Sequence, residues 1–124
     1  MVDGHIDVPY KLFHEWADVT EAVEGRDFDY PRAVAGGLNV PFMSIYTPAK
    51  SEAEGTSHQQ AHLLIDSMEA LAARAPDQFE IVTTPYEAIG AMQAGRMAIA
   101  LGMENGSPIA GDLANVAALS LIHI

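Results

Sequence analysis

Residues 36–48, GGLNVPFMSIYTP, give the strongest indication of the fold class. Between the glycine pair and Thr47-Pro48, the apolar side chains follow one another almost without interruption. Near-continuous apolarity is typical of a strand covered on both faces, because a strand with one face in water alternates apolar and polar residues. Strands covered in this way occur mainly in parallel α/β sheets, so we expect that class here.

The sequence before this strand predicts a shorter strand and then a connection. Residues 5–8, HIDV, form a short run between Gly4 and Pro9, which suits a buried strand that breaks at the proline. In residues 15–29 the acids outnumber the single base, Arg26. A segment with that charge pattern is most simply a solvated connection.

The sequence after residue 48 changes to a helical period. Residues 57–75 place their apolar side chains on one stripe, and Ser57 with Gln60 matches a capping box at the start of that helix. The elements predicted next are a short strand, a capped helix and a further buried strand, at residues 79–84, 85–94 and 97–106. This alternation predicts parallel strands joined by helices, but too few strands to close an eight-stranded barrel, which takes about 250 residues.

The composition narrows the expected ligands and location. The chain has 124 residues, enough for one domain, and its 6 basic and 17 acidic residues give a net charge of −11. This charge repels nucleic acids and anionic membrane surfaces, so small molecules and cations are the expected partners. We find neither an apolar run of roughly 18 residues nor a signal-peptide pattern, and expect a cytoplasmic protein without a membrane segment. Because the chain has no cysteine, a metal has to be bound by His, Asp and Glu.

Three residues are candidate metal ligands. His5 and Asp7 are two positions apart in the first predicted strand, so their side chains leave the same face and can reach one divalent ion. Glu104 follows the apolar run of the last predicted strand, at the carboxyl end where parallel α/β folds collect their chemistry. The alternatives are a hydrogen-bonded polar pair on the first strand and an ordinary loop acid or helix-cap partner at Glu104. The other histidines are weaker candidates and lie at positions 14, 58, 62 and 123.

Three separated blocks, DGHIDVPY, RAVAGGLNVPFMSIYTP and IALGMENGSPI, resemble the amino-terminal part of the membrane dipeptidase (renal dipeptidase) family of zinc peptidases, in the same order and at similar spacings. The resemblance extends over residues 2–116 and implies a partial (β/α)₈ TIM-type barrel, with about the first three barrel strands present. It also implies a hydrolase that cleaves dipeptides and uses two zinc ions.

By the same resemblance, His5 and Asp7 are ligands of one zinc, and Glu104 is the catalytic carboxylate that bridges both. The implied reaction is attack on the peptide carbonyl by a hydroxide shared between the ions, because two metals lower the pKa of a bound water. The oxyanion that forms would be stabilised by zinc. A homo-oligomer is compatible with the full-length family.

The sequence departs from the family at two points. Asn105 stands where the family often has glycine, and this change keeps the neighbouring carboxylate. Residues 117–124, AALSLIHI, do not follow the expected pattern, and we interpret them as a tail of the kind that foreign or frame-shifted sequence gives. Two further histidine ligands and an acidic proton shuttle are expected beyond this chain. We therefore expect the fragment alone to be inactive. The alternative is a small non-catalytic α/β module with at most a single structural metal ion.

Overall fold

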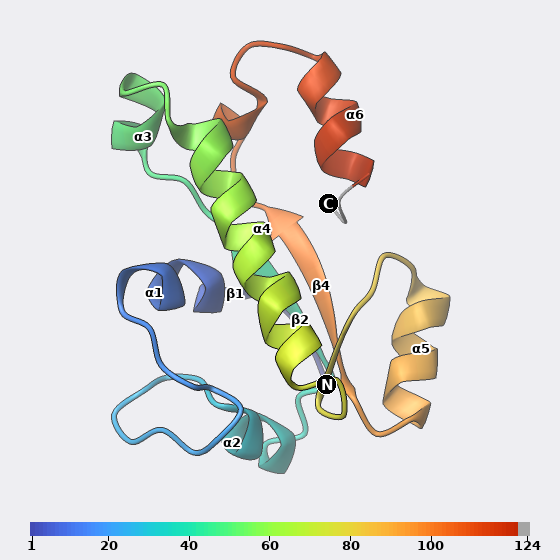
Figure 1. Ribbon diagram of the computed structural model, residues 1–124. Helices are drawn as coiled ribbons and strands as arrows, with labels where there is room; N and C mark the ends of the chain where they lie inside the picture. The colour runs from blue at the N-terminus through green and yellow to red at the C-terminus, as the bar shows by residue number, and fades with distance from the viewer. Residues whose placement is uncertain (122–124) are drawn as a thin grey trace.

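Four parallel strands form the centre of the structure, a computed structural model that describes residues 1–121 (Figure 1). The strands are β1 (Val2–Ile6), β2 (Val40–Ile45), β3 (Phe79–Ile81) and β4 (Met97–Met103), in the spatial order β1-β2-β4-β3. The helices are α1 (Val8–His14), α2 (Tyr30–Ala35), α3 (Ala49–Ala53), α4 (Ser57–Arg74), α5 (Pro85–Gln93) and α6 (Ala114–Leu121), with a short 3₁₀ turn, η1 (Ser107–Ile109). All strand pairs are parallel, so the predicted α/β class is confirmed.

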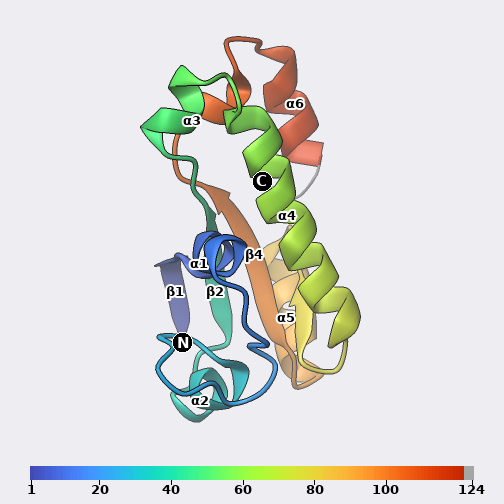
Figure 2. The same ribbon diagram turned by 60° about the vertical axis from the view of Figure 1, so that its left-hand side comes forward.

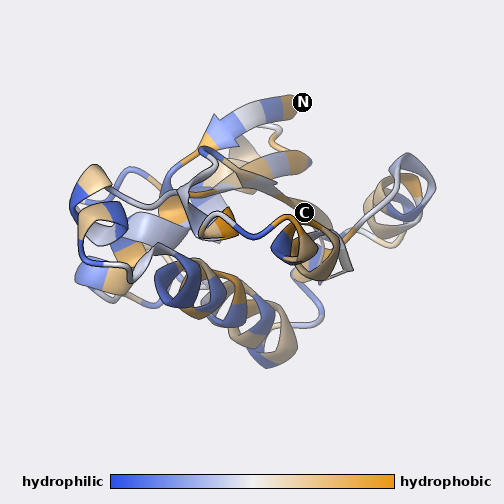
Figure 3. Cartoon of the chain, turned by 90° about the horizontal axis from the view of Figure 1, so that it is seen from above, coloured by the Kyte–Doolittle hydropathy of each residue, from blue (hydrophilic) through white to orange (hydrophobic). Residues whose placement is uncertain are grey.

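Helix α4 covers one face of the sheet and forms the main core. Its side chains at Leu64, Ile65 and Met68 are buried in one cluster with Met43 of β2 and Ile99 of β4. Figure 3 shows hydrophilic and hydrophobic residues interleaved along α4, the pattern of an amphipathic helix. Complete burial of each such side chain contributes about 1.5–3 kcal/mol, so this face holds the helix to the sheet.

Helix α5 covers the opposite face, at the amino ends of the strands. Successive strand residues point to opposite faces, and on β4 the side chain of Ala98 joins Val40, Val82 and Ala91 of α5 in a second, smaller cluster. The spatial order explains this position. The chain moves outward from β2 to β3 and then back to β4, and right-handed crossovers in opposite directions place their helices on opposite faces. In Figure 1, α4 crosses in front of β2 and β4, whereas α5 lies apart from it at the right.

The predicted boundaries of the first strand are wrong. The strand occupies Val2–Ile6 rather than residues 5–8, and Val8 is already the first residue of α1. Pro9 stands in the first turn of that helix, where no backbone N–H is needed and its fixed φ suits the helical backbone. The proline therefore starts a helix instead of only ending a strand.

One predicted helix cap is wrong and the other is confirmed. Helix α4 begins at Ser57, but its N-cap is Thr56, which makes no side-chain capping bond, and Gln60 instead accepts a hydrogen bond from Ser51. The cap predicted for helix α5 is present and is a capping box. The Thr84 hydroxyl accepts from the Glu87 N–H, and the Glu87 carboxylate accepts from the Thr84 N–H.

The acidic segment 15–29 has no helix or strand, as predicted for a connection, but it is tightly held at one point. Asp29 is 1% exposed and accepts hydrogen bonds from the N–H groups of Val23 and Arg32 and from the Arg32 guanidinium. The backbone hydrogen bond from Arg32, more than the other contacts, holds the pKa of Asp29 below its usual value. This buried carboxylate organises the connection that leads into α2.

The last described residues are helical. Helix α6 includes residues 117–121, and its Leu119 is 3% exposed within the main core. His123 lies outside the described residues. The division of the chain into residues 1–116 and a non-native tail 117–124 stays a prediction. No helix within residues 1–121 is long and apolar enough to cross a membrane.

Candidate metal centre

A β-bulge in β1 decides which way His5 points. Val2 pairs with Val40, whereas Ile6 pairs with Met43, so β1 has one more residue than β2 over this interval. Without the extra residue, the side chains of Val2 and Ile6 would lie on the same face of the sheet. Because of the bulge, Val2 shares the face of Val40, whereas Ile6 lies on the opposite face and packs into the core under α4. His5 consequently points to the face opposite α4. Figure 2 shows β1 at the edge of the sheet, next to β2.

Side-chain and backbone contacts hold this end of β1. The backbone N–H of His5 donates to Oδ1 of Asp3 at 3.1 Å, which satisfies an amide inside the irregular stretch of the ladder. Asp7 follows the strand directly and is the N-cap residue of α1, but its side chain makes no capping bond. The carboxylate of Asp7 is therefore free to turn toward His5.

Glu104 follows β4 and lies at the same end of the sheet as His5 and Asp7. It is the first residue after the strand, and its N–H donates to the carbonyl of Ile45 at 3.4 Å, which continues the pairing with β2. Ser44 pairs with Gly102 in the register, so Ser44 and Glu104 lie on one face. The Ser44 hydroxyl donates to Oε2 of Glu104 at 2.9 Å.

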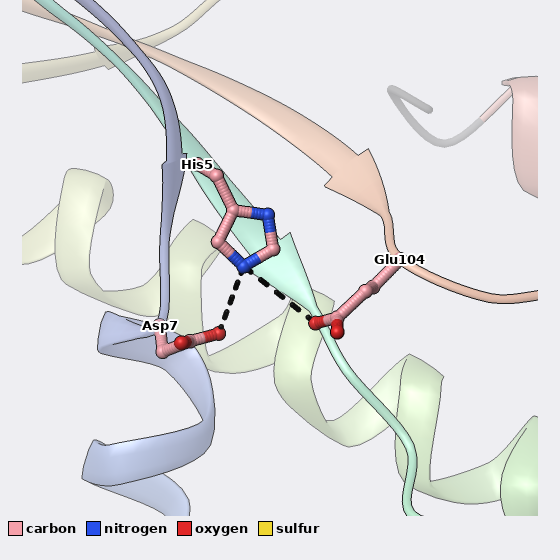
Figure 4. Close-up of side chains that lie close together, drawn as sticks. All are labelled: His5, Asp7 and Glu104. Carbon is pink, nitrogen blue, oxygen red and sulfur yellow. Dashed lines mark ion pairs between the residues drawn. The ribbon is translucent and has the colours of Figure 1, made fainter.

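The three predicted ligands meet at the carboxyl ends of β1 and β4 (Figure 4). His5 Nε2 lies 3.3 Å from Oδ1 of Asp7 and 3.7 Å from Oε2 of Glu104, and one ligand atom from each residue lies within 4.8 Å of the others. Their side chains are 53%, 51% and 37% exposed, so an ion can reach them from solvent.

This spacing fits a shared divalent cation. Ligand atoms about 2.1 Å from a tetrahedral zinc are about 3.4 Å apart, whereas a direct N–H···O hydrogen bond has a heavy-atom distance of about 2.9 Å. Two carboxylates close together also repel each other, and a divalent cation between them would offset that repulsion. The donor set of one imidazole and two carboxylates, without thiolate, is one that zinc accepts.

The remaining histidines lie elsewhere. His14 packs edge-on against the rings of Tyr10 and Phe13. His58 contacts the Pro108 carbonyl through Nδ1 at 2.8 Å, and its ring lies 4.6 Å from that of His62. Among residues 1–121, the group of His5, Asp7 and Glu104 is the one set of three His or acidic side chains with metal-ligand spacing.

Asn105 ties together the loops that follow β2 and β4. Its Nδ2 donates to the Thr47 carbonyl at 2.9 Å, and its Oδ1 accepts from the Ser107 N–H at 3.0 Å and from the Ser107 hydroxyl at 2.7 Å. Thr47, which is 2% exposed, also contacts the Ser107 hydroxyl at 2.7 Å. The residue that departs from the family pattern thus fixes the loop immediately after Glu104.

A cavity of about 740 Å³ opens beside His5 and Asp7, two of the three candidate ligands. His5 and Asp7 line one part of it, and α1 and the acidic connection line the rest, including Lys11 and Arg26. Both bases are paired with acids, Lys11 with Asp27, and Arg26 with Glu15 at 3.1 Å. The cavity is large enough for a small-molecule ligand.

A family model for membrane dipeptidase, peptidase family M19, matches residues 1–124. The chain belongs to this family. The resemblance of the three sequence blocks is thereby confirmed. Members of the family are metallopeptidases that hydrolyse dipeptides, so the predicted use of a metal is correct for the family.

Solved structures of M19 peptidases share the fold. A metallo peptidase from Rhodobacter sphaeroides, liganded with a phosphinate mimic of the dipeptide L-Ala-D-Ala, superposes with a TM-score of 0.83 at 21% identity over 99% of this chain and 43% of its own. The dipeptidase AC gives 0.81 at 21% identity, covering 98% of this chain and 41% of its own. The probable dipeptidase PvdM from Pseudomonas aeruginosa gives 0.81 at 20% identity, covering 99% of this chain and 32% of its own.

The chain therefore spans less than half the length of these M19 structures. Its parallel sheet corresponds to the amino-terminal part of their TIM-type barrels. Strands β1, β2 and β4 lie side by side in the order in which they occur along the chain, as successive barrel strands do. The prediction of a partial barrel is confirmed. Ser44 was not predicted as a site residue, although a polar side chain in an otherwise apolar strand was a visible signal.

Proposed function

We propose that this chain supplies His5, Asp7 and Glu104 to the two-zinc centre of an M19 dipeptidase. The observation that carries the proposal is the convergence of their ligand atoms within 4.8 Å, from two strand ends 97 or more residues apart in the sequence. Structural ion pairs also bring such groups together. Here, however, distances of 3.3 and 3.7 Å suit ligands around an ion better than direct hydrogen bonds.

The three side chains have different roles in this proposal. His5 and Asp7 would hold one ion, and Glu104 would contribute its carboxylate to both. When bound, the zinc ions would supply a hydroxide near neutral pH and polarise the scissile carbonyl. The protein's own contribution is to fix the ligands. The bulge in β1 aims His5, the start of α1 presents Asp7, and the pairing of Glu104 with Ile45 holds the carboxylate at the sheet end.

The proposed substrate is a dipeptide. The R. sphaeroides relative was solved with a mimic of L-Ala-D-Ala. We extend this ligand class to the present chain and propose a preference for dipeptides, with a D-residue tolerated on the carboxyl side. The cavity of about 740 Å³ beside His5 and Asp7 offers the space for a ligand of that size. A net charge of −11 disfavours nucleic acid as an alternative ligand.

Full activity would belong to a protein of the length of the M19 relatives, and this chain would supply half of the metal site. On its own, the chain is expected to bind about one zinc ion and to hydrolyse dipeptides no faster than a buffer control, because the two further histidines and the proton shuttle expected from the family resemblance lie outside it. Zinc binding is thus the direct test of the ligand assignment.

The test is zinc titration of residues 1–124 by isothermal calorimetry, with metal content checked by mass spectrometry. His5→Ala, Asp7→Ala and Glu104→Ala should each weaken binding at least tenfold, since each removes one of three ligands. His62→Ala is the matched control and should bind as the wild type does. Equal affinity in all five proteins would refute the site and favour the non-catalytic module. Rapid hydrolysis of L-Ala-D-Ala by the chain with two bound zincs would refute the half-site assignment.

A further inference from the structure

Ser44 is a buried polar residue in an apolar strand. It is 3% exposed and stands between Met43 and Ile45, which are both fully buried in the core under α4. Its own side chain points the other way, to the face that carries the candidate metal ligands. A buried hydroxyl needs a hydrogen-bond partner, and Ser44 finds it in the Glu104 carboxylate at 2.9 Å.

This contact selects one oxygen of Glu104. The hydroxyl donates to Oε2, the same atom that lies 3.7 Å from Nε2 of His5. A serine hydroxyl has a single proton to donate, so Ser44 holds that oxygen and no other. Among residues 1–121, no other hydrogen-bond donor reaches the carboxylate, and Oε1 is left open.

A carboxylate that is 37% exposed would otherwise rotate freely in water. The backbone of Glu104 is fixed by its bond to Ile45, and the Ser44 hydroxyl fixes the far end of the side chain. Together these contacts keep Oε2 facing His5 and Asp7 before an ion arrives. Ligands held by outer hydrogen bonds bind metals more tightly, because their side chains lose less conformational freedom on binding.

We propose that Ser44 is a positioning residue for the metal centre, which orients Glu104 for zinc binding through the Oγ–H···Oε2 hydrogen bond. This inference rests on the proposed function, because it assumes that Glu104 is a zinc ligand. It assigns Ser44 no contact with substrate.

The test compares zinc affinity and stability of Ser44→Ala, Ser44→Thr and Ser51→Ala in the 124-residue chain. Zinc dissociation constants are measured by competition with a chromophoric chelator, and the Tm of each metal-free protein is measured by circular dichroism. Ser44→Ala should weaken zinc binding about 10- to 100-fold, the usual effect of losing an outer-shell partner. Its metal-free Tm should stay near that of the wild type, because Glu104 can turn to water once the hydroxyl is gone.

Ser44→Thr keeps the hydroxyl and should restore zinc affinity to within about threefold of the wild type. The register partner of Ser44 is Gly102, so no side chain stands directly opposite the added methyl on β4. Ser51 is 8% exposed and bonds to Gln60 away from the site, so Ser51→Ala should bind zinc normally.

The outcomes separate the two proposals. Zinc affinity unchanged in Ser44→Ala but lost in Glu104→Ala would overturn the role of Ser44 and leave the metal site standing. A fall in metal-free Tm without a change in affinity would make Ser44 a packing residue and also overturn the inference. A wild-type chain that binds no zinc, or binds it equally without Glu104, would overturn the proposed function and this inference with it.

Discussion

Replacing Leu64 by alanine should destabilise the chain far more than the same change at the preceding residue. Leu64 is 0% exposed in the core between α4 and the sheet, whereas Leu63 on the same helix is 45% exposed. Truncation of a fully buried leucine removes its transfer free energy and leaves a cavity, at a cost of about 2.7–5 kcal/mol. For the half-exposed leucine, the cost should be about 1 kcal/mol, because little cavity is formed. Helix propensity contributes equally to both variants.

The assay is urea unfolding of the two variants followed by far-UV circular dichroism. A domain of this size has a total stability of about 6–18 kcal/mol, so Leu64→Ala removes a large fraction of it. The midpoint should fall strongly for Leu64→Ala and slightly for Leu63→Ala, with the slope m unchanged in both. Similar midpoints would show that α4 does not pack on the sheet through Leu64, and a lower m would show that the chain does not unfold in one step.

Three further predictions concern a helix cap, a buried acid and the metal. Thr84→Ala removes one half of the capping box with Glu87 and should cost about 1 kcal/mol in urea unfolding; an unchanged midpoint would contradict the cap. The pKa of Asp29 is lowered in the folded state, chiefly by the backbone hydrogen bond from Arg32. The ionised Asp29 therefore contributes its full stabilisation of the fold above the ordinary aspartate pKa near 4, and this contribution is lost as the pH falls through the lowered pKa. Asp29→Asn should therefore flatten the dependence of Tm on pH in the acid range below the ordinary aspartate pKa, and parallel curves would refute this role. Zinc at about 100 times its dissociation constant should stabilise the wild type by about 2.7 kcal/mol, an effect that EDTA reverses and that the weaker binding of His5→Ala reduces to about 1.4 kcal/mol or less.

Local patterns in the sequence were sufficient to predict the strands and the helix that pack directly against the core. The continuous apolar runs of β2 and β4 and the helical stripe of α4 identify these elements, because one face or both faces of each lie against the core. The capping box at Thr84 is likewise a local signal between residues three apart. The same kind of signal failed at Ser57, where the side chain of Gln60 bonds to Ser51 across the turn from α3 instead.

The features that were not predicted from the sequence depend on pairing between strands that are distant in the chain. The bulge in β1 exists only in the register with β2, so nothing in residues 2–6 alone fixes the face on which His5 lies. The pairing of Ser44 with Glu104 joins residues 60 apart, and it depends on β2 and β4 being neighbours. The convergence of the three candidate ligands was predicted, despite the wrong limits of the first strand, because strand-end position and family resemblance point to the same residues.

The position of α5 sets the route by which small molecules reach the candidate centre. The face that carries Ser44 and Glu104 is blocked at its amino end by α5, through the cluster of Val40, Ala98 and Ala91. At the other end of this face, the carboxyl ends of the strands, the side chains of His5, Asp7 and Glu104 are 53%, 51% and 37% exposed. Under the proposed function, a dipeptide would reach the candidate centre from the carboxyl ends of the strands, and its products would leave on that same side.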